Sequence, residues 1–95
     1  MSGERATVGP VLEASPAGLA VVAAIEDLND DVRVENRAAY LRVEVRGRCV
    51  VTRDAIERRL GRSFRLPMDL EAVMPAFKGM LSIDDDRVEW SYEKS

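Results

Sequence analysis

The chain has 95 residues and a formal net charge of −3, with no histidine and one cysteine. It therefore lacks the usual ligands for zinc, haem or an iron–sulfur cluster and the commonest general base, so we expect no cofactor and no catalysis by the chain alone. The acidic balance argues against a nucleic-acid partner, because such binding depends on a basic contact surface. No apolar run reaches about 18 residues, so we expect no membrane span and a cytoplasmic location.

The first third of the chain predicts a strand followed by a helix. Residues 1–7 are small and polar, which predicts a disordered N-terminus. The apolar run Val8–Leu12 predicts a strand, and Pro10 places it at a sheet edge because proline donates no ladder hydrogen bond. Ser15-Pro16 has the form of an N-cap followed by proline, and apolar residues at helical spacing continue to Leu28.

The middle of the chain alternates between apolar and polar residues, which is typical of a half-buried strand. In residues 40–46, one face carries Leu41, Val43 and Val45, and the other carries Tyr40, Arg42, Glu44 and Arg46. Gly47-Arg48 has the composition of a compact turn, and residues 49–51 continue the apolar pattern. The sequence therefore predicts that these two runs pair as a β-hairpin.

Two further helices are predicted after the hairpin. Thr52 is a suitable N-cap, and Gly61 lies in the usual C-terminal position of the helix that follows. Pro67 begins a second short helix, which Pro75 ends or deforms. The apolar residues expected on one side of that helix are Leu70, Val73, Met74 and Phe77.

The last two runs, residues 80–83 and 87–92, predict a hairpin with the acidic tip Asp84-Asp85-Asp86. The element order is then β-α-β-β-α-α-β-β. This order favours an α+β two-layer sandwich, in which the helices pack on one face of a largely antiparallel sheet. We expect residues 8–95 to form this fold as one domain.

Three groups of residues could carry chemistry, and each has a simpler structural explanation. Asp84-Asp85-Asp86 lacks the glycine and distal glutamate of an EF-hand calcium loop, so a hairpin tip is favoured. Glu26-Asp27 and Asp30-Asp31 could pair as catalytic carboxylates, but they cluster where a helix should end. Cys49 is expected to be a small buried residue, although the neighbouring Arg48 could activate its thiol.

The charges are unevenly distributed. Arginines gather in residues 42–65, whereas residues 26–35 and 84–89 are acidic. Such a dipolar surface suits steering onto a charged protein partner. Arg42 and Arg46 alternate with buried positions, so the simpler interpretation is a solvated strand face that keeps a sheet edge soluble.

Four stretches in the same order and spacing carry a resemblance to a known family. They are Val8-Gly9-Pro10-Val11, Val34 to Arg42 (VENRAAYLR), Leu60 to Phe64 (LGRSF) and Asp86 to Trp90 (DRVEW). From about Val8 to Lys94, the chain resembles the small effector or coupling proteins of bacterial multicomponent di-iron monooxygenases. This group includes the toluene, phenol, alkene and methane systems, of which the toluene and alkene types look closest.

The resemblance implies a cofactor-free regulatory subunit that is not itself an enzyme. Such proteins dock on the hydroxylase α-subunit above its di-iron centre. In that family, binding shifts helices that carry iron ligands, tunes oxygen activation and product selectivity, and couples electron delivery to oxidation of an aromatic or alkene hydrocarbon. We expect the free protein to be a cytoplasmic monomer.

The resemblance also implies a hydroxylase-facing segment between the last helix and the following strand. The residues that match this segment are Val73, Pro75, Ala76, Phe77 and Gly79. Pro75 would then deform the helix end so that Ala76 and Phe77 are presented to the partner. The alternative is that Phe77 belongs to the core. Some relatives carry a polar residue at the position of Val73. The methane-type proteins have a long N-terminal arm, whereas seven residues precede Val8 in this sequence, so we expect no arm-dependent role.

A second function class stays open from the residues alone. Small-molecule-sensing regulatory domains of the ACT-like kind also combine helices with an antiparallel sheet. A protein of that class would dimerise and would gain thermal stability with an amino acid or a similar ligand.

Overall fold

The computed structural model describes residues 6–92, and the backbone of these residues forms seven strands and three helices. In chain order the elements are β1 (Thr7–Glu13), α1 (Pro16–Leu28), β2 (Arg33–Arg37), β3 (Tyr40–Arg46), β4 (Arg48–Thr52), α2 (Arg53–Leu60), α3 (Met68–Val73), β5 (Ala76–Lys78), β6 (Met80–Ile83) and β7 (Arg87–Ser91). The predicted disorder of residues 1–5 lies outside the described residues. β1 begins at Thr7, one residue earlier than expected.

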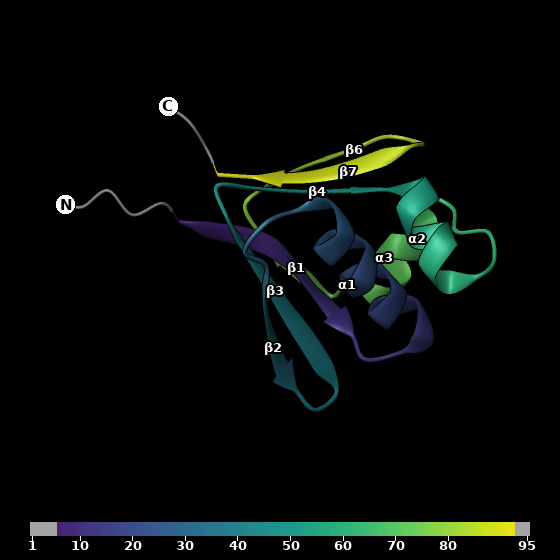
Figure 1. Ribbon diagram of the computed structural model, residues 1–95, viewed down its shortest axis with the longest axis horizontal. Helices are drawn as coiled ribbons and strands as arrows, with labels where there is room; N and C mark the ends of the chain where they lie inside the picture. Colours follow the sequence, from purple (N-terminus) through teal and green to yellow (C-terminus); the bar gives the residue numbers. More distant parts are fainter. Residues whose placement is uncertain (1–5, 93–95) are drawn as a thin grey trace.

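The strands form two antiparallel sheets. One has the order β2-β3-β1-β5 and the other the order β4-β7-β6. Figure 1 shows the three helices together in the angle between the two sheets. The α+β class and the packing of helices on antiparallel strands are confirmed. The division into two sheets, and the strands β2 and β5, were not predicted.

The core lies where both sheets meet α1. Its largest fully buried side chains are those of Trp90, Phe64, Leu12, Ile25, Ile56 and Leu70. β1 contributes Leu12, β7 contributes Trp90 and α1 contributes Ile25, so a single apolar cluster joins both sheets. Burial of this cluster is the main favourable contribution to folding.

Helix α1 is fixed at both ends. At its start the Ser15 hydroxyl accepts a hydrogen bond from the Gly18 amide at 3.1 Å. At its end the Asn29 side chain donates to the carbonyl of Ile25 at 2.8 Å and to that of Val50 at 2.7 Å, and it accepts from the Val50 amide at 3.0 Å. Asn29 therefore pins the helix end to the edge strand β4. The predicted helix is confirmed.

The prediction that Pro10 marks an edge strand is wrong, because β1 lies inside the four-stranded sheet. Its pairing with β3 is interrupted at Gly9 and Pro10, and both residues pair with β5 instead. Gly9 has φ +144°, and a Cβ atom there would overlap the carbonyl oxygen of Val43. A missing proline N–H is tolerated at this place because the ladder to β3 is already broken.

The predicted hairpin between residues 40–46 and 49–51 is also wrong. β3 pairs with β1 and β2, whereas β4 pairs with β7 in the other sheet. Gly47 is the one residue between β3 and β4, and its φ is +77°. One residue is too short for the usual two-residue hairpin loop, so the chain turns a corner and continues into the second sheet.

The hairpin in this region is formed by β2 and β3. Its turn places Ala38 at φ +64°, and the Asn36 side chain accepts a hydrogen bond from the Ala38 amide at 2.9 Å. The predicted alternation of β3 is confirmed, since Leu41, Val43 and Val45 are buried and the residues between them are exposed or half-buried. The sequence pattern thus gives the faces of β3 correctly and its partner incorrectly.

The C-terminal elements agree with the predictions except around Pro75. Helix α2 begins after the Thr52 cap, whose hydroxyl accepts from the Ala55 amide at 3.1 Å, and ends at Gly61. The β6–β7 hairpin is confirmed, with Asp84 accepting hydrogen bonds from two amides of its own turn. α3 ends at Val73, so Phe77 lies in β5 and not on the apolar side of that helix.

We predict that Gly9→Ala lowers the free energy of unfolding by about 3 kcal/mol, because it combines a disfavoured φ with a clash against fixed backbone. Gly61→Ala is the matched control. Gly61 has φ +82°, but nothing lies within 4 Å of an added Cβ, so the strain alone should cost roughly 1 kcal/mol. Urea unfolding measures both variants. Equal losses would show that the contact of Gly9 with β3 is unimportant.

Candidate protein-docking surface

The chain from Pro75 to Met80 lies entirely on the surface. All six residues are exposed, whereas Val73 and Met74 just before them are buried. The structure therefore separates the five residues expected at the interface. Pro75, Ala76, Phe77 and Gly79 are exposed, whereas Val73 is buried in the core.

Strand β5 holds this segment in place. It is an edge strand of the four-stranded sheet, and Ala76, Phe77 and Lys78 lie opposite Val11, Pro10 and Gly9. Phe77 keeps 44% of its surface exposed, so the alternative that it belongs to the core is wrong. A large aromatic side chain on an ordered edge strand is suited to burial against a partner.

Gly79 connects β5 in one sheet to β6 in the other. Its φ is +109°, and an added Cβ would lie 2.8 Å from Val8 Cγ1 and 3.0 Å from the carbonyl oxygen of Ser91. Only glycine fits between β1 and β7 at this point. The role of Gly79 in the segment is thus to let the chain cross closely between the two sheets.

Two hollows flank β5. The first has a volume of about 200 Å³, and its lining residues are Val8, Gly9, Val11, Arg42, Val43, Glu44, Ala76, Phe77 and Lys78. The second has a volume of about 320 Å³, and its lining residues are Ala6, Thr7, Val8, Lys78, Gly79, Met80 and Tyr92. They share Val8 and Lys78, so one continuous surface runs from β3 across β5 to the end of β7.

Lys78 and Met80 also belong to this surface, although neither was predicted from the sequence. Met80 is 56% exposed and lines the second hollow, and Lys78 lines both. Both residues flank Gly79 and so lie within or next to the segment that the resemblance implies. The sequence predicted a deformed helix end here, but residues 76–78 form strand β5. Consecutive residues of this strand line the two hollows on either side of it.

Arginines of residues 42–65 form surface ion pairs with the acidic segments 26–35 and 84–89. Glu89 accepts hydrogen bonds from Arg48 at 2.9 Å and from Arg87 at 3.1 Å, and the hydrogen bond from Arg48 is the main reason that the pKa of Glu89 is lowered. Asp27 pairs with Arg59, which likewise lowers the pKa of Asp27. These carboxylates are therefore ionised partners of arginines rather than proton donors or acceptors for a substrate.

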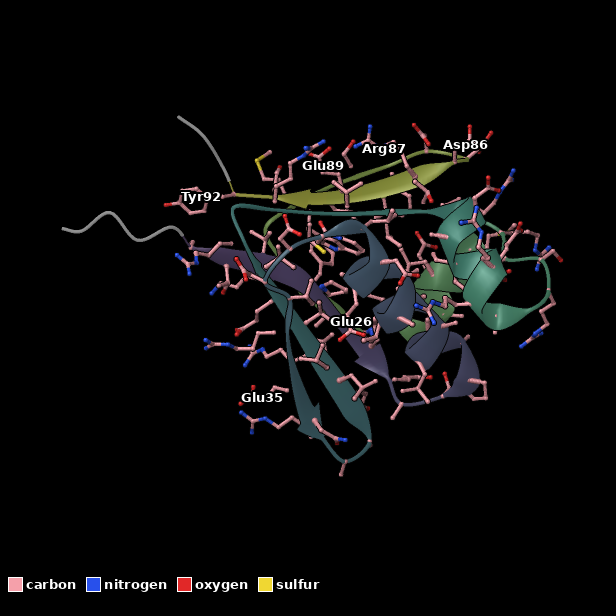
Figure 2. All side chains as sticks on the ribbon, in the orientation of Figure 1. Glu26, Glu35, Asp86, Arg87, Glu89 and Tyr92 are labelled. Carbon is pink, nitrogen blue, oxygen red and sulfur yellow. The ribbon has the colours of Figure 1, made fainter. Side chains whose placement is uncertain are left out.

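The candidate calcium and catalytic carboxylates have structural roles or lie apart. Asp84 accepts hydrogen bonds from the amides of Asp86 and Arg87, which lower its pKa and close the hairpin tip. In Figure 2 the labelled carboxylates Glu26, Glu35 and Asp86 lie on three separate parts of the molecule. Within residues 6–92, no group of three or more His, Cys, Asp and Glu side chains could hold a metal ion.

Cys49 is fully buried, as expected for a small apolar residue. Burial raises the pKa of its thiol to about 12. The proposed activation by Arg48 is not realised, because the Arg48 guanidinium bonds Glu89 instead.

None of the helices in residues 6–92 is both long and apolar enough to cross a membrane.

Comparison with known proteins gives the family. The model of the MmoB/DmpM family matches residues 6–91. The effector subunit of the alkene monooxygenase system of Xanthobacter autotrophicus (strain ATCC BAA-1158 / Py2) is 39% identical over 88 residues, which are 90% of this chain and 86% of that protein. The chain belongs to the MmoB/DmpM family, as the resemblance predicted.

Solved structures show the same fold at lower identity. A chain in a phenol hydroxylase–regulatory protein complex superposes with a TM-score of 0.81 at 21% identity, covering 92% of this chain and 99% of that one. The soluble methane monooxygenase regulatory protein B superposes with a TM-score of 0.69 at 23% identity, covering 98% of this chain and 70% of that one. These proteins therefore share the α+β fold of this chain.

We predict that Cys49 is unreactive in the folded protein. At about pH 8, its reaction with Ellman's reagent should be more than about 100-fold slower than in denaturant, because the thiol is buried and protonated. The pKa rises from 9.0 to about 12 on folding, so this thiol's contribution to stability is complete below pH 9.0 and is lost as the pH rises toward 12. Rapid labelling of native protein would contradict the burial.

Proposed function

We propose that this protein is the cofactor-free effector subunit of a multicomponent di-iron monooxygenase and that it binds the hydroxylase of that system. The observation that carries the proposal is the family match over residues 6–91, together with a 39% identical effector subunit of an alkene monooxygenase. The related regulatory proteins of known structure include one described in a complex with phenol hydroxylase. The same match displaces the ACT-like alternative, which no feature of the structure favours.

The proposed interface is the exposed part of the segment after α3. Pro75, Ala76, Phe77 and Gly79 face solvent, and the pairing of β5 with β1 fixes their positions. Val73 would contribute indirectly, because its buried side chain anchors the end of α3 in the core. A preordered edge strand loses little conformational entropy on docking, which favours tight binding by a small surface.

The proposed mechanism is regulation by differential affinity. An effector that binds one conformation of the hydroxylase better than another shifts the hydroxylase toward the preferred conformation. The chemistry at the di-iron centre then belongs wholly to the partner's α-subunit. This chain would supply binding energy through a rigid surface and thereby tune oxygen activation, coupling to electron delivery and product selectivity.

We further propose that the free protein is a cytoplasmic monomer and that the hydrocarbon oxidised by the complex is an alkene or an aromatic compound. The buried free thiol of Cys49 suits a reducing compartment. The alkene monooxygenase effector subunit supports the alkene class in particular.

The proposed function is tested by titrating the protein into a reconstituted hydroxylase and its electron-transfer partners from the same organism. Product formed per NADH consumed should rise with effector and reach a plateau at a fixed ratio to hydroxylase. A flat response over a wide excess, with a hydroxylase shown to be competent, would contradict the effector role.

We predict that Phe77→Ala raises the concentration needed for half-maximal stimulation by roughly tenfold, the usual effect of removing an aromatic anchor from an interface. Leu28→Ala is the matched control, because Leu28 is 47% exposed, close to the 44% of Phe77, and lies at the end of α1 beside a different hollow. Circular dichroism should remain native for both variants. An equal effect of the two substitutions would remove Phe77 from the interface.

A further inference from the structure

The surface around β5 is locally basic in a chain whose net charge is −3. Lys78 lines both hollows, and Arg42 lines the first on the side of β3. Arg46 lies on the same face of β3, with Glu44 between it and Arg42, and it is opposite Thr7, which lines the second hollow. The charges here thus have the opposite sign to the molecule as a whole.

These cations are not engaged by carboxylates of the chain itself. Within residues 6–92, neither Lys78 nor Arg42 forms an ion pair within 4.0 Å. Arg42 lies opposite Glu35 in the β2–β3 pairing, but the Glu35 carboxylate bonds Arg37 at 3.2 Å. Among residues 6–92, Glu44 is the one carboxylate that lines either hollow, and it is half-buried.

Apolar side chains accompany the free cations. Phe77 lines the first hollow, and Met80 and Tyr92 line the second, all three being exposed. Figure 2 shows Tyr92 at the end of β7 opposite to Asp86, so the acidic hairpin tip is remote from this surface. An apolar centre beside unpaired charges is the usual composition of a protein interface with a charged rim.

We propose that the two hollows receive an acidic segment of the hydroxylase, whose carboxylates pair with Lys78 and Arg42 while an apolar side chain packs against Phe77 and Met80. This inference rests on the proposed effector function and adds the chemistry of the partner surface. The positive charges of Lys78 and Arg42 set the orientation of a protein whose net negative charge alone would repel an acidic partner.

The test is the dissociation constant for immobilised hydroxylase, measured at low and high salt for the wild-type protein, Lys78→Gln, Lys78→Glu and Arg62→Glu. Arg62 is the matched control, since it is exposed between α2 and α3 and lines a different hollow. At low salt we expect Lys78→Glu to weaken binding by about tenfold and Lys78→Gln by about threefold, with both effects shrinking at high salt.

Each result decides between the hypotheses. Weakening by Lys78→Glu that exceeds that of Arg62→Glu and diminishes with salt supports the acidic partner segment. Equal effects of the two reversals, or tighter binding by Lys78→Glu, overturn it while leaving the effector function intact. Failure of the wild-type protein to bind a competent hydroxylase overturns both. A dimer by size-exclusion that Lys78→Glu dissociates, with hydroxylase binding unchanged, assigns the surface to a second copy and also overturns it.

Discussion

The fold depends on the close approach of three strands at Val8–Pro10 of β1. On one side the Gly9 backbone lies against Val43 of β3, at a distance that leaves no room for a side chain. On the other side β5 pairs with Gly9–Val11, and a Cβ added at Gly79 would lie only 2.8 Å from Val8 Cγ1. Because β1 holds β3 and β5 together, the edge strand that carries Phe77 is fixed to the core.

This constraint connects the fold to the proposed regulation. A surface that discriminates between two conformations of a partner must itself keep one shape, since flexibility would let it bind both equally. The segment after α3 is anchored by buried Val73 and Met74 before Pro75, and by the tight crossing at Gly79 after Lys78. Its exposed residues are therefore displayed on a frame with little freedom to adapt.

Some charged side chains form ion pairs within the molecule, and others are left free to contact a partner. Glu89 and Asp27 are occupied by arginines, and these exposed pairs contribute little to stability but keep the surface solvated. Beside β5 the cations have no such partners among the described residues, and they lie next to exposed apolar side chains. The proposed docking surface thus combines unpaired cations with the exposed apolar side chains of Phe77 and Met80.

Local sequence determined the helices and the faces of the strands. Ser15, Thr52 and Gly61 are caps whose hydrogen bonding or backbone geometry depends on neighbouring residues alone, and a period of two assigns the residues of β3 and β7 to their faces. The identity of the buried strand residues therefore required no knowledge of their partners.

Only the tertiary structure decided which strands pair and what the segment exposes. The alternation of β3 is the same whether its neighbour is β4 or β1, so the pattern could not exclude the wrong hairpin. The three-residue strand β5 exists because β1 offers it a pairing edge at Gly9–Val11, a contact between distant parts of the chain. Phe77 is consequently exposed through long-range pairing, which no local pattern encodes.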